Sequence, residues 1–231
     1  MKPFILVPAL GGIVALACSL PAHALTLAPS DQGNISEVDS RLGVPPSVLT
    51  LNPDDTNVSV ASLSTVGGSV TRRGYVWFDI PDAVTDASAV TLKVDVVALG
   101  AGSISFNLVS VEHGFDDFQV ALSGPPTTAG TDLIFDLSNG DSYLDPVTLD
   151  ASTSLIGASF ALSASAVAAV NAAHGGRFAI GFTGLGSLAS LEFIHPVLEV
   201  TTAVPEPSSW LLGSIGLLAA VVRWRRVAVR G

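Results

Sequence analysis

The sequence predicts an all-β fold, an antiparallel jelly-roll-like β-sandwich with one short helix, placed between an N-terminal signal peptide and a C-terminal hydrophobic helix. The body of the chain is rich in Val, Thr, Ser, Leu and Gly, and turn residues recur at short intervals. Apolar and polar residues alternate along Ser88–Leu99, which indicates a strand with one buried and one solvated face. The alternation resumes in Ser103–Leu108 after the glycine-rich turn at 100–102, and so predicts a hairpin.

The first 24 residues have the pattern of a secretory signal peptide. Lys2 supplies a basic start, an apolar stretch follows, and Ala22 and Ala24 form the small-x-small pattern that signal peptidase cuts. We therefore expect the mature chain to begin at Leu25. Cys18 is the only cysteine and lies in the removed segment, so the mature chain has no thiol for a disulfide, a zinc site or a nucleophile.

Residues 25–203 have the length of one β-sandwich domain. The remaining expected strands are Leu25–Ala28, Val48–Leu51, Val58–Leu63, Ser69–Ile80, Thr131–Leu137, Ser154–Ala161, Arg177–Thr183, Ser187–Ile194 and Val197–Thr201. One helix is expected at Ala164–Ala173, capped by Ser163 or Ser165 and ended by the glycines at 175–176.

Residues 204–231 form a tail of three parts in a fixed order. A short proline-containing motif comes first, formed by Val204, Pro205, Glu206 and Pro207. An apolar segment at about 209–222 follows, and then a basic end with Arg223, Arg225 and Arg226. The prolines keep the chain extended. The apolar segment just suffices to cross a thin bilayer when the arginines snorkel, and the arginines predict a cytoplasmic end. A permanent anchor or a buried core helix is the alternative.

This tail closely resembles the PEP-CTERM signal of Gram-negative bacteria that produce exopolysaccharide. The resemblance implies export, transient anchoring in the inner membrane, and recognition by an exosortase-type membrane protease near Pro205–Pro207. Delivery to the cell surface or to the extracellular matrix would follow.

A second resemblance rests on residues 73–81, Arg-Gly-Tyr-Val-Trp-Phe-Asp-Ile-Pro, and 87–94, Ala-Ser-Ala-Val-Thr-Leu-Lys-Val. These segments resemble the core of DNRLRE-type domains, which are related to a family of carbohydrate-binding modules. The expected helix and the closing strand at 196–200 fit the same layout. The resemblance implies a jelly-roll-like sandwich over most of residues 25–202.

The mature domain is strongly acidic, with five basic against nineteen acidic residues once the signal peptide and the tail are removed. This charge excludes a nucleic-acid partner, because nucleic-acid binders need basic faces. It suits solubility outside the cell or calcium binding by Asp-rich loops. Direct binding of an anionic polysaccharide would need calcium bridges or the few arginines.

Tyr75 and Trp77 are the candidate sugar-binding residues, because alternation puts both on one face of a strand. Facing outward, they form a platform on which sugar rings stack; facing inward, they belong to the core. Arg73, beside Arg72, either holds polar groups of a glycan or makes contacts within the protein.

We expect no cofactor other than a structural calcium ion. The candidate ligands are Asp54 and Asp55 in one acidic turn, and Asp136 and Asp141 in another. Asp and Asn are also ordinary turn formers, so both turns have a purely structural alternative. Titratable residues are densest in the segment Glu112–Asp117, which we expect to be a loop. This segment could hold a metal or supply an acid and a base, and the alternative is that it has no chemical role.

The sequence therefore favours an exported, non-enzymatic protein of the surface or matrix, sorted by an exosortase-type protease and associated with exopolysaccharide in a biofilm. One alternative is a carbohydrate-binding module that uses Tyr75 and Trp77. Another is a glycan-active hydrolase or lyase, which would need two facing carboxylates in a cleft. No catalytic residue is assigned.

Overall fold

The computed structural model describes residues 23–40, 50–53, 57–65, 68–123, 137, 140–150, 152–186 and 189–202. Most of these residues lie in strands, so the all-β class is confirmed. The strands are β1 His23–Leu27, β2 Asp31–Ser40, β3 Thr50–Pro53, β4 Asn57–Thr65, β5 Gly68–Asp79, β6 Ala87–Gly100, β7 Ser103–Val109, β8 Ser142–Asp150, β9 Ser154–Ala161, β10 Arg177–Gly186 and β11 Ala189–Thr202. The helices are α1 Phe115–Ser123 and α3 Ala164–Ala172.

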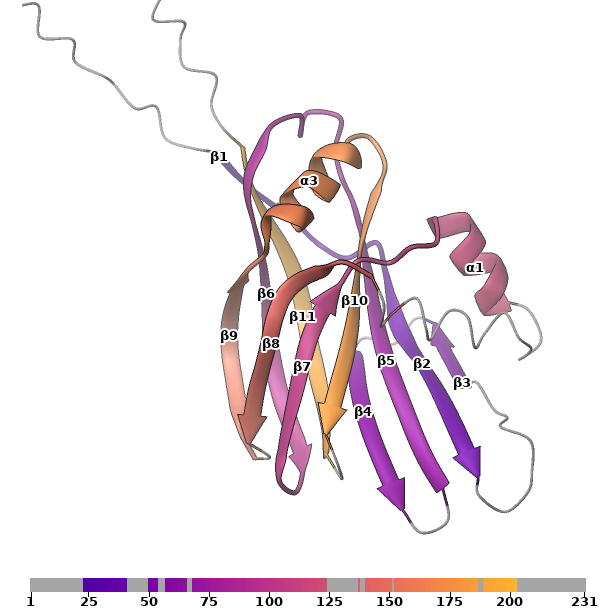
Figure 1. The fold of residues 1–231 in the computed structure, drawn as a ribbon. Coiled ribbons are helices and arrows are strands. Elements are labelled where there is room, and N and C mark those ends of the chain that lie inside the picture. The colour runs from indigo at the N-terminus through magenta and orange to yellow at the C-terminus, as the bar shows by residue number, and fades with distance from the viewer. Residues whose placement is uncertain are drawn as a thin grey trace, which may run out of the picture. The chain divides into compact units, whose positions relative to one another are not determined.

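The strands pair as one sheet of eleven, with the main order β8-β7-β10-β5-β4-β11-β6-β9 (Figure 1). The sheet curls, because its two end strands, β8 and β9, approach each other. Thr153, just before β9, donates its backbone N–H to the carbonyl of Asp150, the last residue of β8, at 3.0 Å, and Ser163, just after β9, donates its backbone N–H to the carbonyl of Tyr143 in β8 at 2.8 Å. The predicted two-sheet jelly roll is therefore not confirmed: the described strands form one curled sheet.

The main core fills the inside of this curled sheet. Alternate residues of β6 are buried there, including Val90, Leu92, Val94 and Val96, as the sequence pattern predicts. The strand extends from Ala87 to Gly100 and pairs along β11 on one side and β9 on the other. Other large fully buried side chains of this core come from β5, β7, β10 and β11: Phe78, Phe106, Phe182 and Phe193.

A second core lies on the opposite face of β5. Tyr75 and Trp77 point away from the main core and pack with Phe118 of α1. Ile35 of β2 and Leu137 belong to the same cluster and are fully buried. In Figure 1, α1 lies outside the sheet, whereas α3 lies across one end of the strands. Helix α1 therefore covers a face of β5 that would otherwise meet solvent.

The first and last described strands pair with each other. His23 lies opposite Thr202, and the antiparallel register continues to Leu27 opposite Leu198. β4 pairs with the first half of β11, and β1 pairs with the second half. Ala24, the last residue of the expected signal peptide, lies in this exposed strand, and a chain that begins at Leu25 keeps its last three paired residues.

Most of the expected elements are present, with some differences. β9 has the predicted bounds, and the two expected strands at 187–201 are one strand with a bulge, at which His195 has a φ of 53°. The sequence analysis did not predict β2, β8 or α1. Ser163 stands at the N-cap of α3, but its side chain makes no capping bond and donates instead to the carbonyl of Ser142 at 3.0 Å. The expected strand Thr131–Leu137 lies outside the described residues except for Leu137.

Candidate functional site

An open groove of about 1120 Å³ lies where the end of β5, the start of β10, the start of α1 and the end of α3 meet. Its wall combines aromatic side chains, carboxylates and one guanidinium. Its principal side chains are Trp77, Asp79, Asp82, Glu112, His113, Phe115, Asp116, Asp117, Tyr143, Arg177 and Phe178. The groove is the candidate functional site of the domain.

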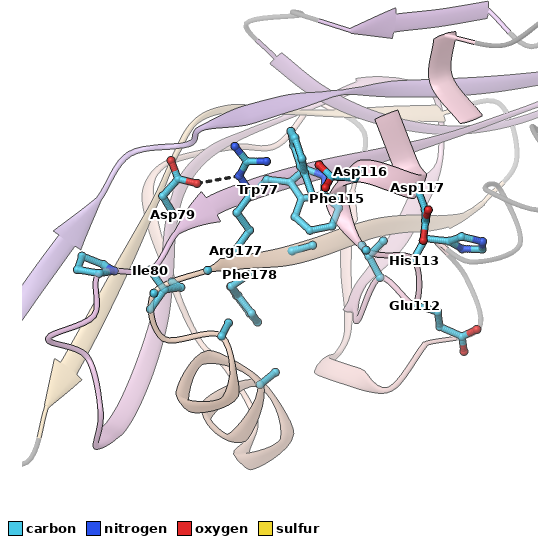
Figure 2. Close-up of a pocket in the computed structure, with 18 of the residues that line it drawn as sticks. Trp77, Asp79, Ile80, Glu112, His113, Phe115, Asp116, Asp117, Arg177 and Phe178 are labelled. Carbon is cyan, nitrogen blue, oxygen red and sulfur yellow. Dashed lines mark hydrogen bonds and ion pairs between the residues drawn. The ribbon is translucent and has the colours of Figure 1, made fainter. Parts of the chain in front are cut away.

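Arg177 is fixed between an acid and an aromatic ring on one wall of the groove (Figure 2). Its Nε donates to Oδ1 of Asp79 at 3.0 Å, and its guanidinium carbon lies 3.6 Å from the centre of the Phe115 ring. Asp79 and Arg177 are cross-strand partners in β5 and β10, which explains why the ion pair forms. Phe115 in turn meets Trp77 edge to face, with ring centres 5.2 Å apart.

The carboxylates of the groove come from two separate segments. Asp79 and Asp82 follow β5, whereas Glu112, Asp116 and Asp117 belong to the segment that starts α1. Figure 2 shows Asp79 and Glu112 well apart in the groove. The sequence analysis expected a loop at Glu112–Asp117, but in the structure a helix begins at Phe115. Asp116 and Asp117 lie in its first turn, where they interact favourably with the positive end of the helix dipole.

Tyr75 and Trp77 are buried, with exposed fractions of 0% and 3%, as their core alternative predicts. They do not form an exposed stacking platform, because Phe118 covers both rings, with ring centres 4.7 Å from Tyr75 and 5.8 Å from Trp77. Trp77 still contributes to the groove wall. Its indole Nε1 is buried and has no hydrogen-bond acceptor among the described residues.

Arg73, the third candidate sugar-binding residue, is half-buried outside the groove. Its guanidinium donates to the hydroxyl of Thr183 on β10. Its neighbour Arg72 donates to the hydroxyls of Ser36 at 3.0 Å and Ser59 at 3.3 Å. Both arginines thus make contacts with neighbouring strands, and the structure does not bring Arg73 together with the groove residues.

Tyr143 of β8 lies at the inner wall of the groove, stacked on Phe178 with ring centres 5.5 Å apart. Burial, and secondarily the negative charge of Asp141, raises the pKa of Tyr143 to about 12. The phenol is therefore neutral throughout the physiological range. Tyr143 therefore contributes an uncharged aromatic surface to the wall of the groove.

The candidate calcium ligands Asp54, Asp55 and Asp136 lie outside the described residues. Asp141 is exposed, and its backbone N–H donates to the hydroxyl of Ser110 at 2.8 Å. Within the described ranges, no three His, Cys, Asp or Glu side chains are placed to hold a metal ion. Calcium binding therefore stays a prediction.

The sequence motif of the tail matches a known family model. Residues 203–226 match the PEP-CTERM protein-sorting motif, which includes Val204, Pro205, Glu206, Pro207 and the arginines at 223, 225 and 226. No curated protein matches the chain. These tail residues, the apolar segment at about 209–222, and Ala22 lie outside the described residues. In the part of the chain that the structure describes, none of the helices is long and apolar enough to span a membrane.

The match identifies the chain as an exported protein that an exosortase sorts through a transient membrane stage towards the cell surface. The body of the protein is an all-β domain, and its described residues form a groove of mixed aromatic and acidic character. The sequence analysis had singled out Trp77 and Glu112–Asp117 separately. It missed Tyr143 and the role of Arg177, which only the fold brings beside them.

Proposed function

We propose that the protein is a non-enzymatic component of the cell surface or extracellular matrix of a Gram-negative bacterium, and that it associates there with exopolysaccharide in a biofilm. The PEP-CTERM motif at residues 203–226 is the observation that carries this proposal. The signal-peptide pattern at the other end of the chain supports it, because that pattern also predicts export.

In this proposal, signal peptidase removes residues 1–24, and the segment at about 209–222 holds the exported chain in the inner membrane. The exosortase-type protease then cuts near Pro205–Pro207. The last paired residue of β11 is Thr202, so this cut leaves every described strand of the domain intact. A folded domain can therefore be released or transferred without losing part of its sheet.

The intact mass of the exported protein tests the processing step. We expect a species that begins at Leu25 and ends near Pro207; a product that retains Arg230 would contradict the proposal. Replacing Pro205, Glu206 and Pro207 together by alanine should leave the chain in the membrane fraction. As a matched control, alanine at Asp145 and Pro146, an exposed acid–proline pair on β8, should leave processing unchanged.

A more specific function, carbohydrate binding, is favoured by the groove. The half-buried Phe115 offers apolar ring surface, and several carboxylates of the groove can accept hydrogen bonds from sugar hydroxyls. Binding of extracellular polysaccharide would then involve the groove rather than an outward platform of Tyr75 and Trp77. Loss of retention on immobilised polysaccharide in a Phe115→Ala variant, with Val120→Ala on the same helix as control, tests this site.

The alternative of a glycan-active hydrolase or lyase uses the same carboxylates. Retaining glycosidases hold two carboxyl groups about 5 Å apart and inverting ones about 6.5–9.5 Å apart. Release of reducing ends from the bound polysaccharide, abolished by Glu112→Gln, would favour that alternative over a non-enzymatic role.

A further inference from the structure

The groove carries a marked excess of negative charge. Five carboxylates line it (Asp79, Asp82, Glu112, Asp116 and Asp117), and Arg177 is the one guanidinium among its described lining residues. Asp116 and Asp117 have a structural role as well, because they lie in the first turn of α1. Asp82 and Glu112 are exposed and lie outside both helices, so helix stabilisation does not account for them.

Arg177 is already engaged within the protein. Its Nε bonds Asp79 and its guanidinium lies over the Phe115 ring, so a uronate or sulfate group would share the charge of Arg177 with Asp79. Such a group would also enter a space lined by four further carboxylates. The carboxylates would repel an anionic group, whereas they would attract an ammonium group.

Trp77 provides an independent sign of a ligand. Its side chain lines the groove with an exposed fraction of 3%, and its indole N–H has no acceptor in the described structure. A buried donor without a partner costs free energy and is rare in native proteins, so it calls for an explanation, and a bound molecule is one such explanation. A ligand hydroxyl is an acceptor that this donor lacks, and because the indole nitrogen is buried, a neighbouring side chain has to move for that bond to form.

We propose that the groove binds a glycan that contains amino sugars with free, positively charged amines, and that it discriminates against acidic polysaccharides. The ammonium groups interact with the carboxylates of Asp82 and Glu112, and a sugar hydroxyl accepts the N–H of Trp77. This inference rests on the carbohydrate binding proposed above and adds to it the charge of the ligand.

Oligomers of glucosamine and of N-acetylglucosamine provide a matched test, because they share one backbone and differ in the charge of the amine. Binding to the full-length protein in detergent is measured by calorimetry. At low salt we expect the glucosamine oligomer to bind roughly tenfold more tightly than the N-acetylated one. This difference should shrink at high salt, since ions screen exposed charges. An oligomer of uronic acid should show no binding.

Variants assign the effect to the groove. Replacing Asp82 by Asn and Glu112 by Gln should weaken binding of the glucosamine oligomer by about tenfold, because two negative charges of the groove are lost, and leave binding of the N-acetylated oligomer unchanged. The control carries Asp145→Asn and Asp150→Asn, which remove two exposed charges of β8 that do not line the groove. It should bind both oligomers like the parent protein.

Trp77 reports binding directly when Trp210 and Trp224 of the tail are replaced by Phe, since the chain has three tryptophans. Binding of either oligomer should then change the fluorescence of Trp77. Trp77→Phe should weaken the binding of both oligomers by roughly three- to tenfold, the effect of one hydrogen bond. Equal affinity for the two oligomers would overturn the amino-sugar inference and leave carbohydrate binding intact. Absence of binding by either oligomer and by neutral glycans would overturn the glycan groove itself.

Discussion

The packing of helix α1 on β5 should depend mainly on one side chain, Phe118. This residue is fully buried and meets both Tyr75 and Trp77 edge to face. Replacing a buried Phe by Ala removes apolar burial and leaves a cavity, at a cost of about 3–5 kcal/mol. In a domain of this size, each kcal/mol corresponds to about 2–4 °C in Tm, so Phe118→Ala should lower the Tm by roughly 10 °C if unfolding stays cooperative.

The nine residues of α1 are too few to form a stable isolated helix in water, so its stability comes from packing on the sheet. We therefore expect α1 of the Phe118→Ala variant to detach before the sheet unfolds. With Trp210 and Trp224 replaced by Phe, the emission of Trp77 should shift to the red at a lower temperature than the far-UV signal of the strands. In the parent protein the two transitions should coincide.

Val120→Ala is the matched control, because Val120 lies on the same helix with an exposed fraction of 72%. A surface change of this kind should alter stability by less than about 0.5 kcal/mol. A Phe118→Ala variant with the Tm and the coincident transitions of Val120→Ala would refute the view that Phe118 holds α1 over β5.

Three other outcomes follow from the described contacts. Gly74→Ala should destabilise the domain by about 1–3 kcal/mol in urea denaturation, because the added methyl group would overlap a buried valine; a variant as stable as the parent would contradict this packing. Asn34→Ala should cost about 1–3 kcal/mol in the same assay, since the buried Asn34 accepts the N–H of Ser59, and an unchanged midpoint would mean that water replaces it. In a spectrophotometric titration, Tyr143 should ionise near pH 12, whereas an unfolded tyrosine ionises near pH 10. Its contribution to stability is therefore fully present below about pH 10 and falls as the pH rises towards 12; Asp141→Asn should lower the pKa, and a normal titration would show that Tyr143 is solvated.

Strong local alternation made part of this fold predictable. β6 and β9 follow from their residue pattern, and α3 follows from an alanine-rich segment ended by glycines. β2 was missed because its ten residues are mostly polar, although Ile35 among them is fully buried. α1 left a weak signal, two phenylalanines three residues apart at 115 and 118, which is too short a pattern to separate a helix from a loop.

The candidate site was less predictable, for a different reason. Alternation shows that Tyr75 and Trp77 share a face of a strand, but it does not show what covers that face. The cover is Phe118, more than forty residues further along the chain. The Asp79–Arg177 ion pair spans 98 residues, so its formation depends on strand pairing that no local pattern reveals. The tail was predictable because its function lies in a contiguous motif.

The pairing of β11 has a mechanical consequence. A protein attached to the cell surface through its C-terminus carries any pulling force into its last strand. β11 has twelve residues paired with β6 and is also bonded to β1 at its end. A pull along β11 loads these hydrogen bonds together in shear instead of opening them one after another. A domain attached through this end would be held at a point where its sheet is suited to resist force.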